Sequence, residues 1–165
     1  METKRAPDDA VILVAEDVEN DIVLIRRAFE RARIKNPLLV VRDGEEVVRY
    51  LEGVGPFSNR EQYPLPDLLL LDLKMPRMDG FEVLQWIRDH PQFKKLRVVV
   101  LTSSQDIYDV NKAYQMGASS FLVKPLEFDN YTALATTMAR FWLEYSRTPS
   151  YETHEAPAKS SHENI

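Results

Sequence analysis

The sequence predicts an α/β fold, in which five parallel strands form a doubly wound sheet with helices on both faces. The first observation is that five short apolar runs alternate along the chain with segments of helical periodicity. The second is that these runs lack alternating polar residues, which is typical of strands buried on both faces. Parallel strands joined by right-handed helical connections satisfy both observations, and 165 residues are enough for one such domain.

The expected strands are short runs rich in Val, Leu and Ile that end next to polar residues. In chain order they lie at 10–15, 38–41, 68–71, 98–101 and 120–123. The expected helices carry an apolar residue at every third or fourth position, and Pro91 and Gly117 end two of them. In chain order the helices cover about 18–29, 45–52, 79–89, 107–114 and 128–145.

Three segments fall outside this alternation of strands and helices. Residues 1–9 form an N-terminal extension before a domain at 10–146, and residues 147–165 have the composition of a disordered tail. Residues 53–66 contain three prolines and two glycines, which predicts a long loop inserted in the domain. Such a loop is often functional, but a surface insertion without a function fits equally well, because the cost of loop closure grows slowly with length.

The composition excludes several classes of protein. The chain has no Cys, so it contains no disulfide scaffold, thiolate zinc site or cysteine nucleophile. Its net charge of −5 argues against an intrinsic surface for nucleic acid or anionic membranes. No apolar run approaches the ~20 residues that span a bilayer, and the polar N-terminus lacks the apolar segment of a signal peptide. We therefore expect a cytoplasmic protein that binds neither nucleic acid nor membranes.

Chemically active residues follow four of the five expected strands. Glu16 and Asp17 follow the first strand, Asp72 the third, Thr102 the fourth and Lys124 the fifth. The carboxyl ends of parallel strands share one edge of the sheet, where such folds bind ligands. Carboxylates gathered there repel one another by several kcal/mol at an effective dielectric constant of about 20, so a cation is expected among them. Oxygen ligands favour Mg²⁺, and the lysine and hydroxyl suit a phosphoryl group.

Asp72 is the expected reactive residue of this set. A carboxylate can attack phosphorus and form an aspartyl phosphate, and Asp72 ends the most apolar strand, in the predicted middle of the sheet. Taken singly, an Asp after a strand is usually a cap or turn residue, and a lone Lys is a surface residue. The joint occurrence of these residue types at all four strand ends favours the phosphoryl site.

Four motifs carry a resemblance to a known family. They are Val-Ala-Glu-Asp at 14–17, Leu-Leu-Leu-Leu-Asp-Leu-Lys-Met-Pro-Arg-Met-Asp-Gly at 68–80, Val-Leu-Thr-Ser at 100–103 and Phe-Leu-Val-Lys-Pro at 121–125. In this order they resemble the receiver domain of two-component response regulators, over about residues 10–145. The resemblance implies a flavodoxin-like sheet with strand order 2-1-3-4-5. The interval between the first two motifs is longer than usual in the family, and the loop at 53–66 accounts for the excess.

The resemblance also implies a mechanism. Asp72 would accept a phosphoryl group from a phosphohistidine on a partner histidine kinase, or from a small phosphodonor. Mg²⁺ would be bound by Asp17, Asp72 and the backbone carbonyl of Lys74, and by Glu16 through water. The protein would catalyse only its own phosphorylation and dephosphorylation, as a signalling protein rather than an enzyme that turns over external substrates.

A conformational switch is the expected consequence of phosphorylation. Lys124 would pair with the phosphoryl oxygens, Thr102 would hydrogen-bond to them, and the aromatic Phe121 would turn inward in response. The resemblance implies a cis peptide bond between Lys124 and Pro125, where a cis bond is affordable. The added charge of nearly two units would bias two conformations that already exist.

The expected output surface is the face made by the fourth helix, the fifth strand and the fifth helix. The fifth helix carries an apolar stripe, most of which is expected to be ordinary core packing. Its members are Tyr131, Leu134, Met138, Phe141 and Tyr145. Trp142 and Tyr145, late in the helix, are expected to reach a partner or a second copy in a homodimer. The short remainder of the chain leaves no room for an output domain, so the signal is expected to leave by docking.

A narrower resemblance and three alternatives complete the sequence-based interpretation. The long loop and the C-terminal extension are similar to response regulators paired with bacterial phytochromes, which would make a phytochrome-type photoreceptor kinase the phosphodonor. A phosphatase of the haloacid dehalogenase type would need an Asp where Lys74 stands. A flavin-binding domain would need a phosphate-binding loop where Glu16 and Asp17 stand. A degenerate receiver that only docks would not need the acidic residues at all.

Overall fold

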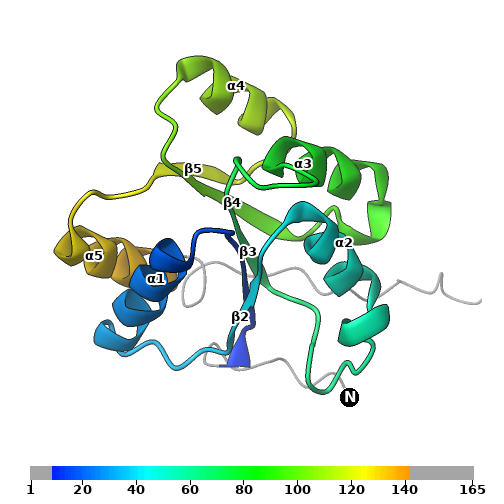
Figure 1. Ribbon diagram of the computed structural model, residues 1–165, viewed down its shortest axis with the longest axis horizontal. Helices are drawn as coiled ribbons and strands as arrows, with labels where there is room; N and C mark the ends of the chain where they lie inside the picture. The colour runs from blue at the N-terminus through cyan, green and yellow to red at the C-terminus, as the bar shows by residue number, and fades with distance from the viewer. Residues whose placement is uncertain (1–8, 142–165) are drawn as a thin grey trace, which may run out of the picture.

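The computed structural model describes residues 9–141 and contains one five-stranded parallel sheet with helices on both faces (Figure 1). The strands are β1 (Ile12–Ala15), β2 (Leu38–Val41), β3 (Leu68–Leu71), β4 (Arg97–Thr102) and β5 (Ser120–Val123). The helices are α1 (Glu19–Arg31), α2 (Gly44–Glu52), α3 (Gly80–Asp89), α4 (Ile107–Gln115) and α5 (Phe128–Met138), with short 3₁₀ turns η2 (Gly55–Phe57) and η3 (Pro91–Phe93). The predicted fold class is confirmed.

The strand order is β2-β1-β3-β4-β5, as the resemblance implied. Every neighbouring pair is parallel, and β1 sits in register between its neighbours, with Val14 opposite both Val40 and Leu70. All four residues of β1 and of β3 are buried, which explains their unbroken apolar runs. The order places the carboxyl ends of β1 and β3 side by side at the middle of the sheet.

The sheet separates two cores. One face packs against α1 and α5, through residues such as Phe29 and Tyr131. The other face packs against α2, α3 and α4, through residues such as Val47, Val83 and Ala113. Within the described part of the chain, no helix combines the length and the apolar character needed to cross a bilayer.

Most of the apolar stripe of α5 is core, as expected. Tyr131 and Met138 are buried and Leu134 packs against the same core, whereas Phe141 is exposed. Regular α-helix ends at Met138 and residues 139–141 continue as a π-helical turn. The rest of the helix predicted to residue 145, with Trp142 and Tyr145, lies outside the described residues.

The loop at 53–66 is packed against α2. The guanidinium of Arg60 donates hydrogen bonds to the carbonyls of Tyr50 at 2.7 Å and Leu51 at 2.6 Å, in the last turn of that helix. The ring centroids of Tyr50 and Phe57 lie 5.2 Å apart. The Tyr50 hydroxyl donates a hydrogen bond to the carbonyl of Pro64 at 2.8 Å. The last carbonyls of a helix have no partner inside the helix, so Arg60 satisfies groups that would otherwise need water.

Candidate functional site

Three carboxylates meet at the carboxyl ends of β1 and β3, and we call Glu16, Asp17 and Asp72 the acidic cluster. Each offers an oxygen within 4.8 Å of the oxygens of the other two. The neighbouring strands place them there, because Glu16 and Asp17 follow β1 directly and Asp72 follows β3. Glu16 is 1% exposed and Asp72 is 5% exposed, so little water screens their mutual repulsion.

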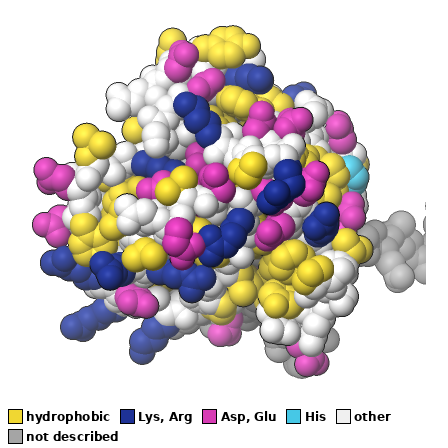
Figure 2. Space-filling view, in the orientation of Figure 1, with side chains coloured by type: hydrophobic (Ala, Val, Ile, Leu, Met, Phe, Trp, Pro, Cys, Tyr) yellow, Lys and Arg dark blue, Asp and Glu magenta, His cyan; other side chains and the backbone are white. Residues whose placement is uncertain are grey.

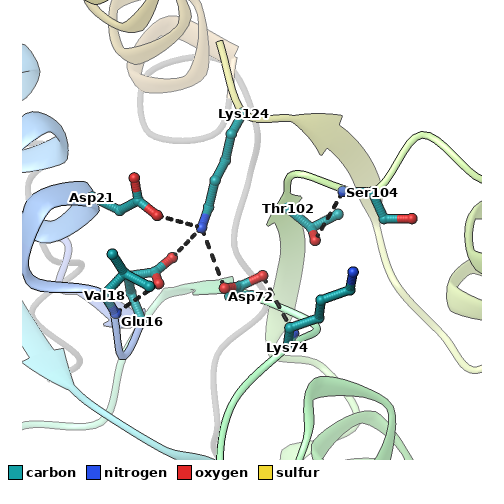
Figure 3. A network of polar contacts seen from close by, with 8 residues as sticks. All are labelled: Glu16, Val18, Asp21, Asp72, Lys74, Thr102, Ser104 and Lys124. Carbon is teal, nitrogen blue, oxygen red and sulfur yellow. Dashed lines mark hydrogen bonds and ion pairs between the residues drawn. The ribbon is translucent and has the colours of Figure 1, made fainter. Parts of the chain in front are cut away.

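Lys124, directly after β5, extends its ammonium group into this cluster (Figure 3). The Nζ atom lies 2.6 Å from Glu16 Oε2, 2.9 Å from Asp21 Oδ2 and 3.2 Å from Asp72 Oδ2. A lysine has three N–H donors, so these three contacts use its whole capacity. A buried charge that is fully paired in this way avoids the penalty of an unpaired one.

Asp21 is a member of this network that the sequence reasoning missed. It lies in the first turn of α1, four positions after Asp17, and this helix begins at the same edge of the sheet because it follows β1 after three residues. This spacing is the feature of the sequence that would have indicated it. When side chains alone are compared, Asp21 is 24% exposed, whereas the side chains of Glu16 and Asp72 are 2% and 6% exposed.

The network shifts the pKa of both Glu16 and Lys124. Burial raises the pKa of Glu16 from its ordinary value of 4.5 to about 7; Asp72 adds to the rise, and the hydrogen bond from Lys124 opposes it. Burial alone would lower the pKa of Lys124, but its bonds to Glu16 and Asp21 and the charge of Asp72 raise it above the ordinary value. Lys124 therefore remains a cation, and Glu16 takes up a proton near neutral pH.

Thr102 and Lys74 lie beyond Asp72 on the side away from Asp21 (Figure 3). Thr102 ends β4, is 1% exposed, and its Oγ1 accepts a hydrogen bond from the Ser104 N–H at 3.4 Å. The backbone N–H of Lys74 donates to Asp72 Oδ1 at 3.4 Å. The carboxylate of Asp72 thus lies between an ammonium group and a hydroxyl, which is an arrangement suited to a tetrahedral anion.

Phe121 lies on β5, three positions before Lys124. Its side chain is partly buried and packs against the core on the α4 face of the sheet. Its backbone N–H donates to the hydroxyl of Tyr114 at 3.1 Å, which connects β5 to α4. The peptide bond between Lys124 and Pro125 is trans, so the expected cis bond is wrong for this structure. The two isomers of such bonds differ by only ~0.5–1 kcal/mol, so the local sequence does not decide between them.

The donor set fits a hard divalent cation. All three residues of the acidic cluster offer carboxylate oxygens, which Mg²⁺ and Mn²⁺ prefer. In addition, Oδ1 of Asp17 is buried and accepts no hydrogen bond from any described residue. Such an orphaned acceptor is costly, and a cation at this position would satisfy it. The acidic cluster is therefore the place where this chain would hold a metal ion.

A second ion pair fixes the loop that follows Asp72. Arg77 donates to Oδ2 of Asp43 from Nε at 2.9 Å and from a terminal nitrogen at 2.7 Å. Arg77 has a φ of 65°, an unusual left-handed conformation for a residue with a side chain. The neighbouring backbone is also joined, because the Gly44 N–H donates to the Met78 carbonyl at 3.0 Å. Sequence reasoning did not find this pair, because its members lie 34 residues apart.

Asp43 also begins α2. Its side chain is 3% exposed and accepts a hydrogen bond from the Glu46 N–H at 2.8 Å, as an N-cap does. Burial by itself would raise the pKa of the Asp43 carboxyl, but the bonds from the Glu46 backbone and the Arg77 guanidinium outweigh burial and lower the pKa. The ionised Asp43 therefore joins the start of α2 to the loop that positions Lys74.

Sequence relatives place this geometry in a known context. The chain is 36% identical over 148 residues to the probable methanogenesis regulatory protein FilR2 of Methanothrix harundinacea, which covers 88% of this chain and 91% of the relative. It is 34% identical over 140 residues to the response regulator Rcp1 of Synechocystis sp., which covers 85% of this chain and 93% of the relative.

Solved structures agree in fold and in size. The Mn²⁺-bound form of Rcp1 superposes with a TM-score of 0.76 at 33% identity, covering 86% of this chain and 99% of that one. The response regulator RPA3017 in red light signalling of R. palustris gives 0.82 at 33% identity, and the phosphorylated cyanobacterial phytochrome response regulator RcpA gives 0.79 at 32%, both with the same coverage. Residues 12–136 match the response regulator receiver domain, and the chain therefore belongs to that family of two-component signalling proteins.

Proposed function

We propose that this chain is a response regulator that accepts a phosphoryl group on Asp72 from the phosphohistidine of a partner histidine kinase. The observation that carries the proposal is the position of the Asp72 carboxylate, which lies 3.2 Å from the Lys124 ammonium and within 4.8 Å of the other two carboxylates of the acidic cluster. An Asp72 oxygen forms the new bond to phosphorus as the bond from phosphorus to the histidine nitrogen breaks, and the imidazole leaves. Catalysis in such a transfer is mainly positioning and charge neutralisation.

We propose that the acidic cluster binds Mg²⁺ through Asp17, Asp72 and the carbonyl of Lys74, with Glu16 acting through water. When bound, the ion neutralises charge on the transferring phosphoryl oxygens. Lys124 supplies the protein's own positive charge, and its raised pKa keeps it protonated. The Mn²⁺-bound form of the relative Rcp1 supports a divalent ion in a site of this kind.

The conformational response is proposed to pass through Thr102 and Phe121. Thr102 is buried at the end of β4, and its hydroxyl would donate a hydrogen bond to the new phosphoryl group. Its backbone carbonyl already accepts a hydrogen bond from the Lys124 N–H at 2.8 Å, so movement of Thr102 reaches β5 directly. Phe121 is partly buried on the α4 side and would repack as β5 and α4 adjust.

The partner kinase is proposed to be a phytochrome-type photoreceptor. The support comes from two similar proteins of solved structure, one a phytochrome response regulator and the other a regulator in red light signalling. The outgoing signal is proposed to leave through the face formed by α4, β5 and α5. That face carries large exposed hydrophobic side chains, and Figure 2 shows hydrophobic side chains over α4 at the top of the view. The exposed hydrophobic residues of the whole face are Ile107, Tyr108, Tyr114, Val123, Leu126 and Phe141.

Phosphorylation is tested by incubating the protein with Mg²⁺ and acetyl phosphate and measuring intact mass. We expect an acid-labile gain of one phosphoryl group that is lost in Asp72→Asn and without Mg²⁺. Glu19→Gln is the matched control, because Glu19 is an exposed carboxylate of the same region that pairs with Arg42. If the wild-type protein gains no phosphoryl group, the proposed phosphoryl acceptance is wrong.

A further inference from the structure

We propose that Asp21 is a positioning residue that weakens phosphoryl binding by competing for Lys124. The inference rests on the proposed function, and it adds a residue outside the acidic cluster that sets how tightly the phosphoryl group is held. The starting observation is that Asp21 Oδ2 lies 2.9 Å from Lys124 Nζ, a contact longer than that of Glu16 at 2.6 Å and shorter than that of Asp72 at 3.2 Å.

All three donors of Lys124 are occupied before any phosphoryl group arrives. They point to Glu16, Asp21 and Asp72. A phosphoryl group on Asp72 brings new acceptor oxygens, and an N–H can reach one of them only if a present acceptor is released. Phosphoryl binding therefore includes the free energy of breaking one of these charge-assisted contacts.

Asp21 is the acceptor that is easiest to release. Glu16 and Asp72 belong to the acidic cluster, so a bound cation compensates their charge, whereas Asp21 lies outside it. Asp21 is also the most exposed of the three, at 24%. It lines a pocket of about 250 Å³ together with Lys124, Ser103 and Tyr131, so water can take the place of the ammonium.

The direction of the contact supports competition rather than assistance. Figure 3 shows Asp21 on one side of the Lys124 amine and Thr102 on the other, with Asp72 between them. The phosphoryl group on Asp72 would lie towards Thr102. The attraction of Asp21 thus draws the ammonium away from the position of the phosphoryl oxygens.

The test is a titration of Mg²⁺-loaded protein with beryllofluoride, a mimic of the phosphoryl group, followed by calorimetry. We expect Asp21→Asn and Asp21→Ala to bind beryllofluoride about tenfold more tightly than wild type, which corresponds to ~1.4 kcal/mol. Asp21→Glu keeps the charge and should resemble wild type. Glu19→Gln removes a charge from the same turn of α1 without touching Lys124, and should leave the affinity unchanged.

A second measurement separates competition from a structural effect. Mn²⁺ affinity in the absence of beryllofluoride should be equal or weaker in Asp21→Asn, because a negative charge near the cation is lost. A merely structural role would weaken both ligands. If Asp21→Asn and Asp21→Ala bind beryllofluoride no more tightly than wild type, the inference is overturned while the proposed function stands. If wild type binds no beryllofluoride, the proposed function fails and this inference fails with it.

Discussion

At the scale of single residues, the charge balance of the site depends on three carboxylates that share one ammonium group. Lys124 contacts Glu16, Asp21 and Asp72, and burial raises the pKa of Glu16 to about 7. In the folded protein Glu16 therefore binds a proton more strongly than in the unfolded chain, where its pKa is near 4.5. The sign follows: this residue makes the metal-free protein less stable as pH rises from about 4.5 to 7.

The same pKa predicts a pH-dependent affinity for Mg²⁺. The cation must displace the proton of Glu16, so affinity should fall by up to about tenfold per pH unit below pH ~7. In Glu16→Gln the affinity should be lower, and its dependence on pH should be much flatter. Calorimetric titration between about pH 5.5 and 8.5 measures both, and Glu19→Gln should keep the wild-type dependence. An equal wild-type affinity at both ends of this range would show that Glu16 is already ionised.

Sequence reasoning found most single residues of the site, because each follows an apolar strand and the edge of a parallel sheet is predictable. It missed Asp21, whose spacing from Asp17 places it near the site but whose contact with Lys124 depends on the orientation of α1. It also missed Asp43, whose contact with Arg77 joins residues that are 34 positions apart. It also implied a cis bond before Pro125 that the structure does not contain. The strand ends were thus visible in the sequence, and the contacts between the connecting elements were not.

At the scale of elements, the ion pair of Asp43 and Arg77 joins the start of α2 to the loop after β3. Asp43 is buried and serves as an N-cap as well, so it carries two structural tasks. Gly80 adds a tight contact to the same loop, because a Cβ at this position would collide with the carbonyl of Asp72. The loop that holds Lys74 is therefore fixed from both ends.

We predict that Asp43→Ala lowers the free energy of unfolding by about 2–3 kcal/mol, because it removes a cap and leaves Arg77 without its partner. Asp79→Ala removes the N-cap of α3, a half-buried carboxylate that pairs with no arginine among the described residues, and should cost about 1 kcal/mol. Urea unfolding at neutral pH compares the two variants. The contribution of Asp43 should disappear as pH falls below about 4, because its lowered pKa stabilises the fold only while the carboxyl is ionised. Equal losses in both variants would contradict a linking role for Asp43.

At the scale of the whole molecule, six of the eight large hydrophobic side chains that are exposed among the described residues lie in or next to α4, β5 and α5. Ile107 is 69% exposed and Tyr108 67%, and Leu126 is fully exposed. A monomer rarely exposes contiguous apolar surface without a partner. The prediction of a homodimer through α4, β5 and α5 therefore stays open to a direct test, although Trp142 and Tyr145 lie outside the described residues.

We expect weak dimerisation that increases on treatment with Mg²⁺ and beryllofluoride. Ile107→Glu should reduce dimerisation, because it buries an unpaired charge in the contact. Val54→Glu is the matched control, since Val54 is 43% exposed but belongs to the loop after α2. Sedimentation velocity over a range of concentrations measures the association. The same distribution for wild type and Ile107→Glu would rule out this face as the dimer contact.

The loop at 53–66 has a consequence for how this fold can vary in length. Arg60 attaches the loop to the last turn of α2, and the loop then leads to the amino end of β3, whereas the acidic cluster lies at the carboxyl end. Residues gained or lost here are absorbed on the side of the sheet remote from Asp72. The length of this segment can therefore change while Asp72 keeps its neighbours. The position of an insertion, rather than its size, therefore decides whether the arrangement of the acidic cluster is preserved.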